Sequence, residues 1–188
     1  MNDAMDRNIF TDLETDRLVL RNIAPEDAGF FFKVFSQPDV TRYLLDHEPF
    51  RSPEDAEMWI EWYLNAVPDH NRWIITNKET GERMGTCGFH MWDRRNNSVE
   101  IGYDLLPEYR GHGYMNEALR SALDFAFRTM DVNRICATIH PDNSRSIRLA
   151  ENLGFRKEGI LRDLLFADGR YHDHCLYALL QWEYAGRS

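Results

Sequence analysis

A glycine-containing loop between an apolar strand pattern and an amphipathic helix pattern is suited to binding an anion. Its residues are Arg110, Gly111, His112, Gly113, Tyr114 and Met115. Glycine lets the backbone approach a ligand closely, and the first N–H groups of a helix lack internal partners and carry the positive end of the helix dipole. The loop is therefore predicted to hold a pyrophosphate.

Two common phosphate loops do not match this stretch. The P-loop requires a Gly-Lys-Ser or Gly-Lys-Thr end, and the dinucleotide fingerprint requires a glycine where Asn116 stands. A purely structural turn is the alternative interpretation of Gly111 and Gly113.

Histidines and cysteines give weaker signals. His172 and His174 would share one face of a strand, but no third ligand stands at a recognisable spacing, so no metal site is predicted. Cys87, Cys136 and Cys175 lie far apart without a C-x-x-C pair. This pattern favours neither a disulfide framework nor zinc, and it fits a reducing compartment.

Length and charge limit the classes of protein. A chain of 188 residues fits one domain, predicted to span residues 1–188 with a loose lead-in over residues 1–14. A net charge of −9 argues against a nucleic-acid-binding surface and mildly favours a cationic partner such as an amine, although acidity also aids solubility. No apolar leader and no run of about 18 apolar residues occurs, so we expect no membrane partner and a cytoplasmic location.

The elements that must position the loop follow from periodicity. The first half is predicted to form a strand over 17–22, a helix from Pro25 to about Phe35, and a second helix that starts after Ser52 and ends before Pro68. Three strands of an antiparallel meander should then lead into the loop. They cover 73–76, about 84–92 and 99–106.

The second half is predicted to start with the helix that follows the loop. Its buried stripe consists of Met115, Ala118, Leu119, Ala122, Phe125 and Ala126. A buried strand over 134–139 and a short helix over 143–152, closed by Gly154, come next. Two final strands are expected over 155–165 and 172–183.

This order of elements resembles the GNAT superfamily of acetyl-CoA-dependent N-acyltransferases over about residues 15–184. The pyrophosphate loop of that family maps onto Arg110, Gly113 and Met115, with Met115 in place of the usual small residue. The motif Asn143-x-x-Ser146, with Leu153-Gly154-Phe155 after it, is similar to the branch of ribosomal-protein-alanine N-terminal acetyltransferases.

The resemblance implies a fold and a set of donor-binding residues. The fold would be α/β (α+β), with a mixed, mostly antiparallel central sheet of about six to seven strands flanked by about four helices. Acetyl-CoA would be the acyl donor. The residues implied to bind it are Tyr103, Asp104, Leu105, Arg110, Gly111, His112, Gly113, Tyr114, Met115, Asn143 and Ser146.

Glu100 is the candidate general base, because many enzymes of this family use a glutamate on the strand before the pyrophosphate loop. Strand alternation puts Glu100 on the face of Gly102, opposite the apolar residues Val99 and Ile101. A solvated or ion-paired carboxylate is the alternative interpretation.

The acid that protonates the leaving thiolate is harder to assign. The tyrosine that many relatives use is replaced by Ala150. Ser146 matches a serine near the thiol in some relatives, although it could equally be a first-turn hydroxyl, and a thiol of pKa near 8.5 could leave without strong acid help. The backbone of Tyr103 to Leu105 is expected to bulge and aim one N–H at the thioester oxygen.

The sequence therefore predicts an N-acetyltransferase that moves an acetyl group to a primary amine by direct attack in a ternary complex. The acceptor would be an amine-bearing small molecule or the α-amino group of a protein N-terminus, and the protein could be a homodimer. Asn143 would bind the pantetheine arm and cap a helix. The alternative is a non-catalytic acyl-CoA-binding sensor or assembly module, which Met115 and Ala150 would favour.

Overall fold

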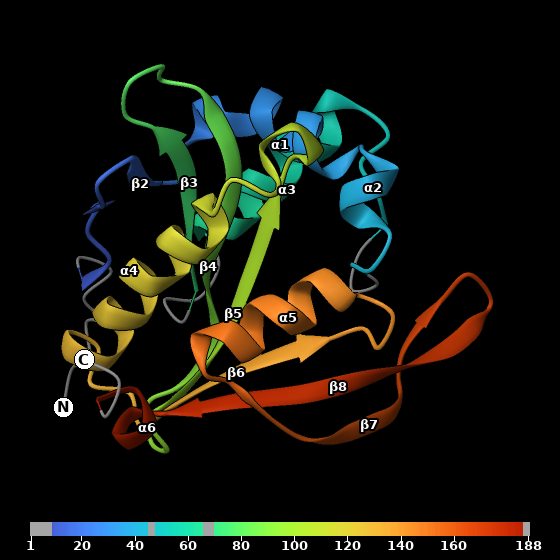
Figure 1. Cartoon of the computed structure of the whole chain (residues 1–188). Helices are drawn as coiled ribbons and strands as arrows, with labels where there is room; N and C mark the ends of the chain where they lie inside the picture. Colours follow the sequence, from blue (N-terminus) through green and yellow to red (C-terminus); the bar gives the residue numbers. More distant parts are fainter. Residues whose placement is uncertain (1–8, 45–47, 66–69, 186–188) are drawn as a thin grey trace, which may run out of the picture.

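The strands of the protein form one eight-stranded sheet (Figure 1). The computed structural model describes residues 9–44, 48–65 and 70–185. The strand order is β1-β2-β3-β4-β5-β6-β8-β7, and every neighbouring pair is antiparallel except β5 and β6. The strands are β1 (Leu13–Glu14), β2 (Leu18–Asn22), β3 (Asn71–Asn77), β4 (Arg83–Asp93), β5 (Ser98–Leu105), β6 (Arg134–Ile139), β7 (Arg156–Ala167) and β8 (Arg170–Leu180).

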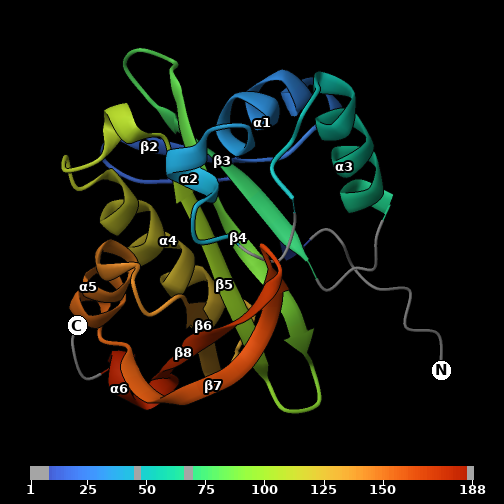
Figure 2. The same ribbon diagram turned by 90° about the vertical axis from the view of Figure 1, so that its right-hand side faces the viewer.

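Helices cover both faces of this sheet (Figure 2). The α4 and α5 helices pack on one face, and α1 and α3 pack on the other. The helices are α1 (Ala28–Phe35), α2 (Pro38–Thr41), α3 (Pro53–Asn65), α4 (Tyr114–Arg128), α5 (Ser144–Leu153) and α6 (Gln181–Ala185), with 3-10 turns η2 (Pro25–Asp27) and η3 (Pro107–Tyr109). The predicted α/β class with a mixed, mostly antiparallel sheet is confirmed.

The amphipathic pattern of α4 explains its place in the core. All six residues of its predicted stripe are buried against the sheet, so the apolar spacing alone gave the correct face. The helix α5 is also as predicted, with Asn143 as its N-cap and Gly154 in a left-handed conformation at its end.

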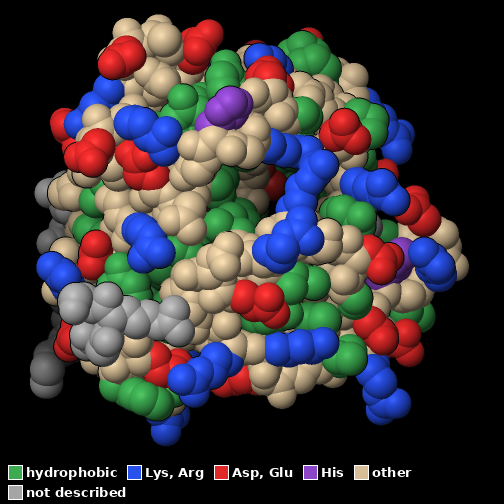
Figure 3. Space-filling model, viewed as in Figure 1, with side chains coloured by type: hydrophobic (Ala, Val, Ile, Leu, Met, Phe, Trp, Pro, Cys, Tyr) green, Lys and Arg blue, Asp and Glu red, His purple; other side chains and the backbone are tan. Residues whose placement is uncertain are grey.

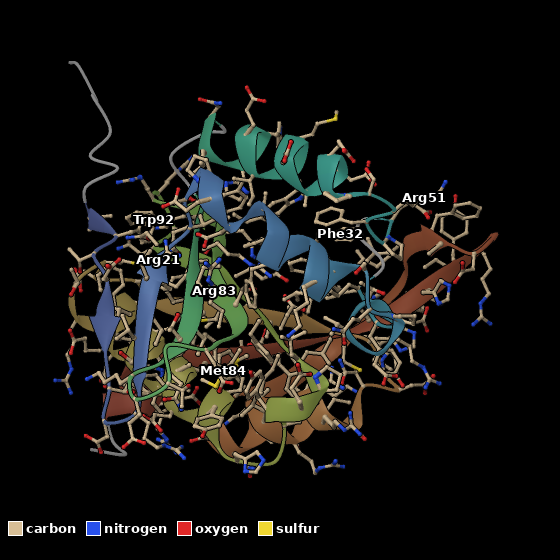
Figure 4. The ribbon with its side chains drawn as sticks, turned by 90° about the horizontal axis from the view of Figure 1, so that it is seen from above. Arg21, Phe32, Arg51, Arg83, Met84 and Trp92 are labelled. Carbon is tan, nitrogen blue, oxygen red and sulfur yellow. The ribbon has the colours of Figure 1, made fainter. Side chains whose placement is uncertain are left out.

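Buried Asp27 fixes the start of α1 on the sheet. Its carboxylate accepts a hydrogen bond from the N–H of Ala24 at 2.8 Å and lies 2.6 Å from Arg21 and 3.0 Å from Arg83. The two arginines come from β2 and β4 (Figure 4). A charge with no exposed surface is thus paired twice, as burial of an ion requires.

The ends of the chain differ from expectation. Leu13–Glu14, within the expected lead-in, pairs with β2 as a short strand. The final strand was predicted to reach residue 183 but ends at Leu180, because the Glu183 carboxylate accepts a hydrogen bond from the Leu180 N–H and starts α6. No helix in the described part of the chain combines the length and apolarity needed to cross a bilayer.

The feature of the fold that shapes the site is the separation of β5 from β6. The two strands pair through three positions only, from Ser98 with Arg134 to Glu100 with Cys136. Beyond Glu100 they diverge, so the end of β5 lacks a strand on that side (Figure 1). An opening in the middle of a sheet leaves backbone groups available to a ligand.

Candidate functional site

A cleft of about 910 Å³ lies where β5 and β6 diverge. The end of β5, the short helix α2 and the N-terminal ends of α4 and α5 form its walls. Figure 3 shows this face hollowed, with basic side chains at the rim. Its lining includes Tyr103, Asp104, Leu105, Arg110, Gly111, Gly113, Tyr114, Met115, Asn143 and Ser146. Ten of the donor-binding residues predicted from the sequence are therefore brought together, and His112 is exposed outside this lining.

The predicted loop does end at a helix N-terminus. Gly111 and Gly113 have φ of 86° and 80°, a left-handed conformation that favours glycine. Gly113 is the N-cap of α4 and supplies no side chain, so the first N–H groups of the helix stay open toward the cleft. Met115 is only 7% exposed and its side chain belongs to the core, which explains how a large residue fits at this position.

Arg110 connects two walls of the cleft, the end of β5 and the short helix α2. Its Nε donates to the carbonyl of Leu105 at 3.0 Å, and its Nη2 donates to the carbonyl of Asp39 at 3.1 Å. Burial, followed by the nearby charge of Arg145, lowers the pKa of Arg110 from its ordinary value. A cation held among other cations in a cleft is favourable for binding an anion.

Three further arginines of the cleft were not singled out from the sequence. Arg42 lies next to α2, and Arg145 and Arg148 lie on α5. The spacing of Arg145 and Arg148, three residues apart on one helix face, was the signal that could have revealed them. Their local positive charge contrasts with the net charge of −9 for the whole chain.

The open edge of β5 presents two backbone N–H groups to the cleft. The N–H of Leu106 donates to the carbonyl of Met84, which fixes the alternation of the β4–β5 ladder. By that alternation the N–H groups of Tyr103 and Leu105 point away from β4, toward the side where β6 has diverged. Backbone donors at this edge can stabilise a developing oxyanion.

The bulge expected at Tyr103 to Leu105 is not present, and that prediction was wrong. The β4–β5 register is continuous from Gly85 with Leu105 to His90 with Glu100. Glycine explains the regular pairing, because a Cβ on Gly85 would come within 2.1 Å of the Asp104 carbonyl oxygen. The strand edge is therefore opened by the departure of β6 rather than by a bulge.

Tyr103 contributes a side chain as well as backbone. Its hydroxyl lies 2.7 Å from the Ser146 hydroxyl, between β5 and α5. Burial raises the pKa of Tyr103 to about 12, although the Ser146 hydroxyl opposes this shift. A protonated phenol beside Ser146 was missed at the sequence level, where only the backbone of Tyr103 was considered. Alternation of the strand was the available signal, since it places this ring against the helices.

Asn143 and Asp104 are both engaged within the protein. The Asn143 side-chain oxygen accepts a hydrogen bond from the Ser146 N–H at 3.2 Å, so the predicted capping role is confirmed. The Asp104 carboxylate is buried and pairs with Arg72 at 2.5 Å. Its side chain is thus satisfied by Arg72, and its backbone borders the cleft.

Glu100 lies on the opposite face of β5 from Tyr103, as the alternation predicted. It is not among the residues that line the cleft with Ser146. Burial raises the pKa of Glu100, but contacts with His90 and Thr138 outweigh that effect and leave the pKa below its ordinary value. The carboxylate is therefore ionised at neutral pH and faces the sheet surface that α1 and α3 partly cover.

A helix N-terminus with open N–H groups, a basic cleft and an open strand edge are the parts expected of an acyl-CoA-dependent N-acyltransferase. Comparison with known proteins gives the family. The acetyltransferase (GNAT) domain family matches residues 17–156. An uncharacterized N-acetyltransferase of Bacillus licheniformis, p20, is 42% identical over 176 residues, covering 93% of this chain and 98% of that protein. The chain belongs to the GNAT family of N-acetyltransferases.

More distant relatives have recorded acceptors. The ribosomal protein uS5-alanine N-acetyltransferase of Escherichia coli is 30% identical, with 89% of each chain covered. The crystal structure of spermidine N-acetyltransferase from Vibrio cholerae in complex with CoA and spermine has a TM-score of 0.80 at 23% identity. That match covers 91% of this chain and 99% of the other, and at this identity it supports the fold alone.

Proposed function

We propose that this protein, as a single domain, transfers the acetyl group of acetyl-CoA to a primary amine by direct attack in a ternary complex. The acceptor is the α-amino group of a protein or peptide, or a small amine. The observation that carries the proposal is the continuity of the cleft, which joins the N-terminus of α4 to the open edge of β5.

The donor is bound from its phosphates to its thioester. The N–H groups at the start of α4, with Arg110 beside them, suit the pyrophosphate. Asn143 at the start of α5 is positioned for the pantetheine arm. The N–H groups of Tyr103 and Leu105 at the open strand edge then suit the thioester oxygen.

Proton transfer requires groups at two positions. Glu100 is proposed to receive the proton of the acceptor amine, directly or through water or another side chain. On the other face of the strand, the hydroxyl pair of Tyr103 and Ser146 is proposed to protonate the departing thiolate. Amines with a pKa near 7.7–8.0, as α-amino groups have, lose a proton more readily than lysine-type amines.

One relative supports the protein acceptor. By its name, it acetylates an alanine of ribosomal protein uS5, and it is 30% identical to this chain. A cytoplasmic location is proposed from the three free cysteines, which suit a reducing compartment.

The test is an acceptor panel with the purified protein and acetyl-CoA. Peptides with N-terminal alanine, serine and threonine, spermidine and simple arylalkylamines are compared by release of the free thiol and by mass spectrometry of the product. Acetylation of at least one acceptor above background hydrolysis, reduced in Glu100→Gln with CoA binding unchanged, supports the enzyme. Tight CoA binding with no acetylated product from any acceptor supports the non-catalytic binder instead.

A further inference from the structure

His90 lies directly across the β4–β5 ladder from Glu100. The two residues are register partners, and His90 Nε2 lies 3.8 Å from Glu100 Oε1. Their side chains are 32% and 21% exposed, so solvent reaches both groups and reaches the imidazole more. An imidazole and a carboxylate therefore share the face of the sheet on which the candidate base lies.

The surroundings hold the imidazole in place. The ring of His70, just before β3, stacks at 6.5 Å between centroids and 20° between planes. One edge of the ring lies close to β5, since a Cβ on Gly102 would meet His90 Cε1 at 3.4 Å. The imidazole thus has both a stacked ring and a strand as neighbours, next to its carboxylate.

Other charged groups facing this pair come from β3 and β6. The Arg72 guanidinium also approaches Gly102, but it is paired with Asp104. Thr138 of β6 is a hydrogen-bonding neighbour of Glu100, and the Cys136 thiol is close enough for its pKa to be raised partly by Glu100. Glu100 is therefore the carboxylate that lies next to the imidazole on this side.

The chemistry favours the imidazole as the proton acceptor. A carboxylate whose pKa lies below its ordinary value is a poor match for an α-ammonium with a pKa near 7.7–8.0, whereas imidazole is the side chain best suited to proton transfer near neutral pH. A carboxylate beside an imidazole orients the ring and stabilises the imidazolium that forms, as in hydrolase triads. His90 supplies the imidazole of such a pair, and Glu100 supplies the carboxylate.

We propose that His90 takes the proton of the acceptor ammonium and that Glu100 acts through His90, as a positioning residue. This inference rests on the proposed function and refines its base. The ammonium gives one proton to the ring nitrogen that faces away from Glu100. The amine then attacks the thioester carbonyl carbon, and the C–S bond breaks as the C–N bond forms. The Tyr103–Ser146 hydroxyl pair protonates the departing thiolate and regains a proton as the nitrogen loses its second one, and His90 releases its proton to solvent.

The test compares His90→Gln, Glu100→Gln and the double variant, using the best acceptor of the panel at saturating acetyl-CoA. His90→Gln is expected to lower kcat/KM for the acceptor by about 100-fold. The double variant should be no worse than His90→Gln, because two residues that act in series do not lose activity independently. His172→Gln is the matched control, since a glutamine can still donate to the Ala167 carbonyl that His172 contacts at 3.2 Å.

Two readouts separate this role from a structural one. Imidazole added to His90→Ala should restore part of the rate. The acid limb of the pH profile should disappear in His90→Gln, because the group that accepts the proton is gone. Thermal melts and CoA binding confirm that each variant is folded, with His90→Asn as a second substitution.

Different results would overturn this inference and the proposed function. Turnover by His90→Gln within twofold of the unaltered protein, or losses that multiply in the double variant, overturn this inference alone. Absence of turnover with every acceptor overturns the proposed function, and this inference with it.

Discussion

Arg17 and Glu117 join the start of β2 to the first turn of α4. Arg17 Nε lies 2.7 Å and Nη2 lies 2.6 Å from Glu117 Oε2. Arg17 also donates to the carbonyl of His112 at 3.2 Å, and its guanidinium lies 4.5 Å above the ring of Tyr114. The Arg17 side chain thus contacts the loop at His112 and at Tyr114, and its ion pair with Glu117 holds it there.

We predict that Arg17→Ala weakens CoA binding by about three- to tenfold, because the loop that we propose binds the pyrophosphate loses contacts that fix its conformation. Isothermal titration calorimetry measures the change. Lys78→Ala is the control, since Lys78 holds the same N-terminal segment through Glu14 and Thr15 without touching the loop. Equal affinities in the two variants would contradict a role for Arg17 in shaping the loop.

Gly113 should not tolerate a side chain. With φ of 80° at the N-cap of α4, Gly113→Val would be strained and would place methyl groups where we propose that the backbone binds the phosphates. We expect CoA binding to weaken by at least about tenfold. Gly81→Val, at φ of 70° in a turn outside the cleft lining, controls for backbone strain and should lose stability with CoA affinity unchanged.

Gly113 and Tyr103 show which parts of the site could be predicted from the sequence and which could not. A glycine loop before an amphipathic helix is a local pattern, so the loop, α4 and the cap of α5 by Asn143 could be predicted. The Tyr103–Ser146 contact joins residues 43 positions apart, and the contacts of Arg17 with Glu117 join residues 100 positions apart. Strand alternation places the Tyr103 ring against the helices, but the partner of each side chain depends on how the helices pack on the sheet, which periodicity does not give.

Individual contacts also explain two predictions that were wrong, the bulge in β5 and the end of the final strand. The position of a bulge depends on how two strands approach each other, which here depends on Gly85 and its contact with Asp104. The end of β8 depends on one hydrogen bond from Leu180 to Glu183. Periodicity gives the face of an element better than its last residue.

Arg148 is predicted to contribute electrostatic affinity for the phosphates of CoA. Because it is exposed at the rim of the cleft, Arg148→Ala should weaken binding by only about two- to fivefold, and the salt dependence of binding should become shallower. Titrations at low and high salt test this. Arg128→Ala removes the same charge from the far end of α4, and it should leave both the affinity and its salt dependence unchanged.

The Tyr103 hydroxyl is predicted to protonate the departing CoA thiolate together with the Ser146 hydroxyl. Since burial raises its pKa to about 12, the phenol stays protonated across the working pH range and can donate throughout. Tyr103→Phe should therefore lower kcat by about 10- to 100-fold with little change in the KM for acetyl-CoA. Ser146→Ala in the Tyr103→Phe background should add little, because the two hydroxyls act as one contact.

The raised pKa of Tyr103 also predicts that the free energy of unfolding falls at high pH. A tyrosine whose pKa is higher in the folded state than its ordinary value of 10 contributes stability that is complete below pH 10 and is lost as the pH rises toward 12. Chemical unfolding between pH 8 and pH 11.5 should show a smaller loss of unfolding free energy in Tyr103→Phe than in the unaltered protein.

The matched control for the activity of Tyr103→Phe is Tyr177→Phe, which removes a buried hydroxyl that faces Glu151 outside the cleft lining. If Tyr103→Phe retains the same kcat as Tyr177→Phe, the thiolate receives its proton from another source.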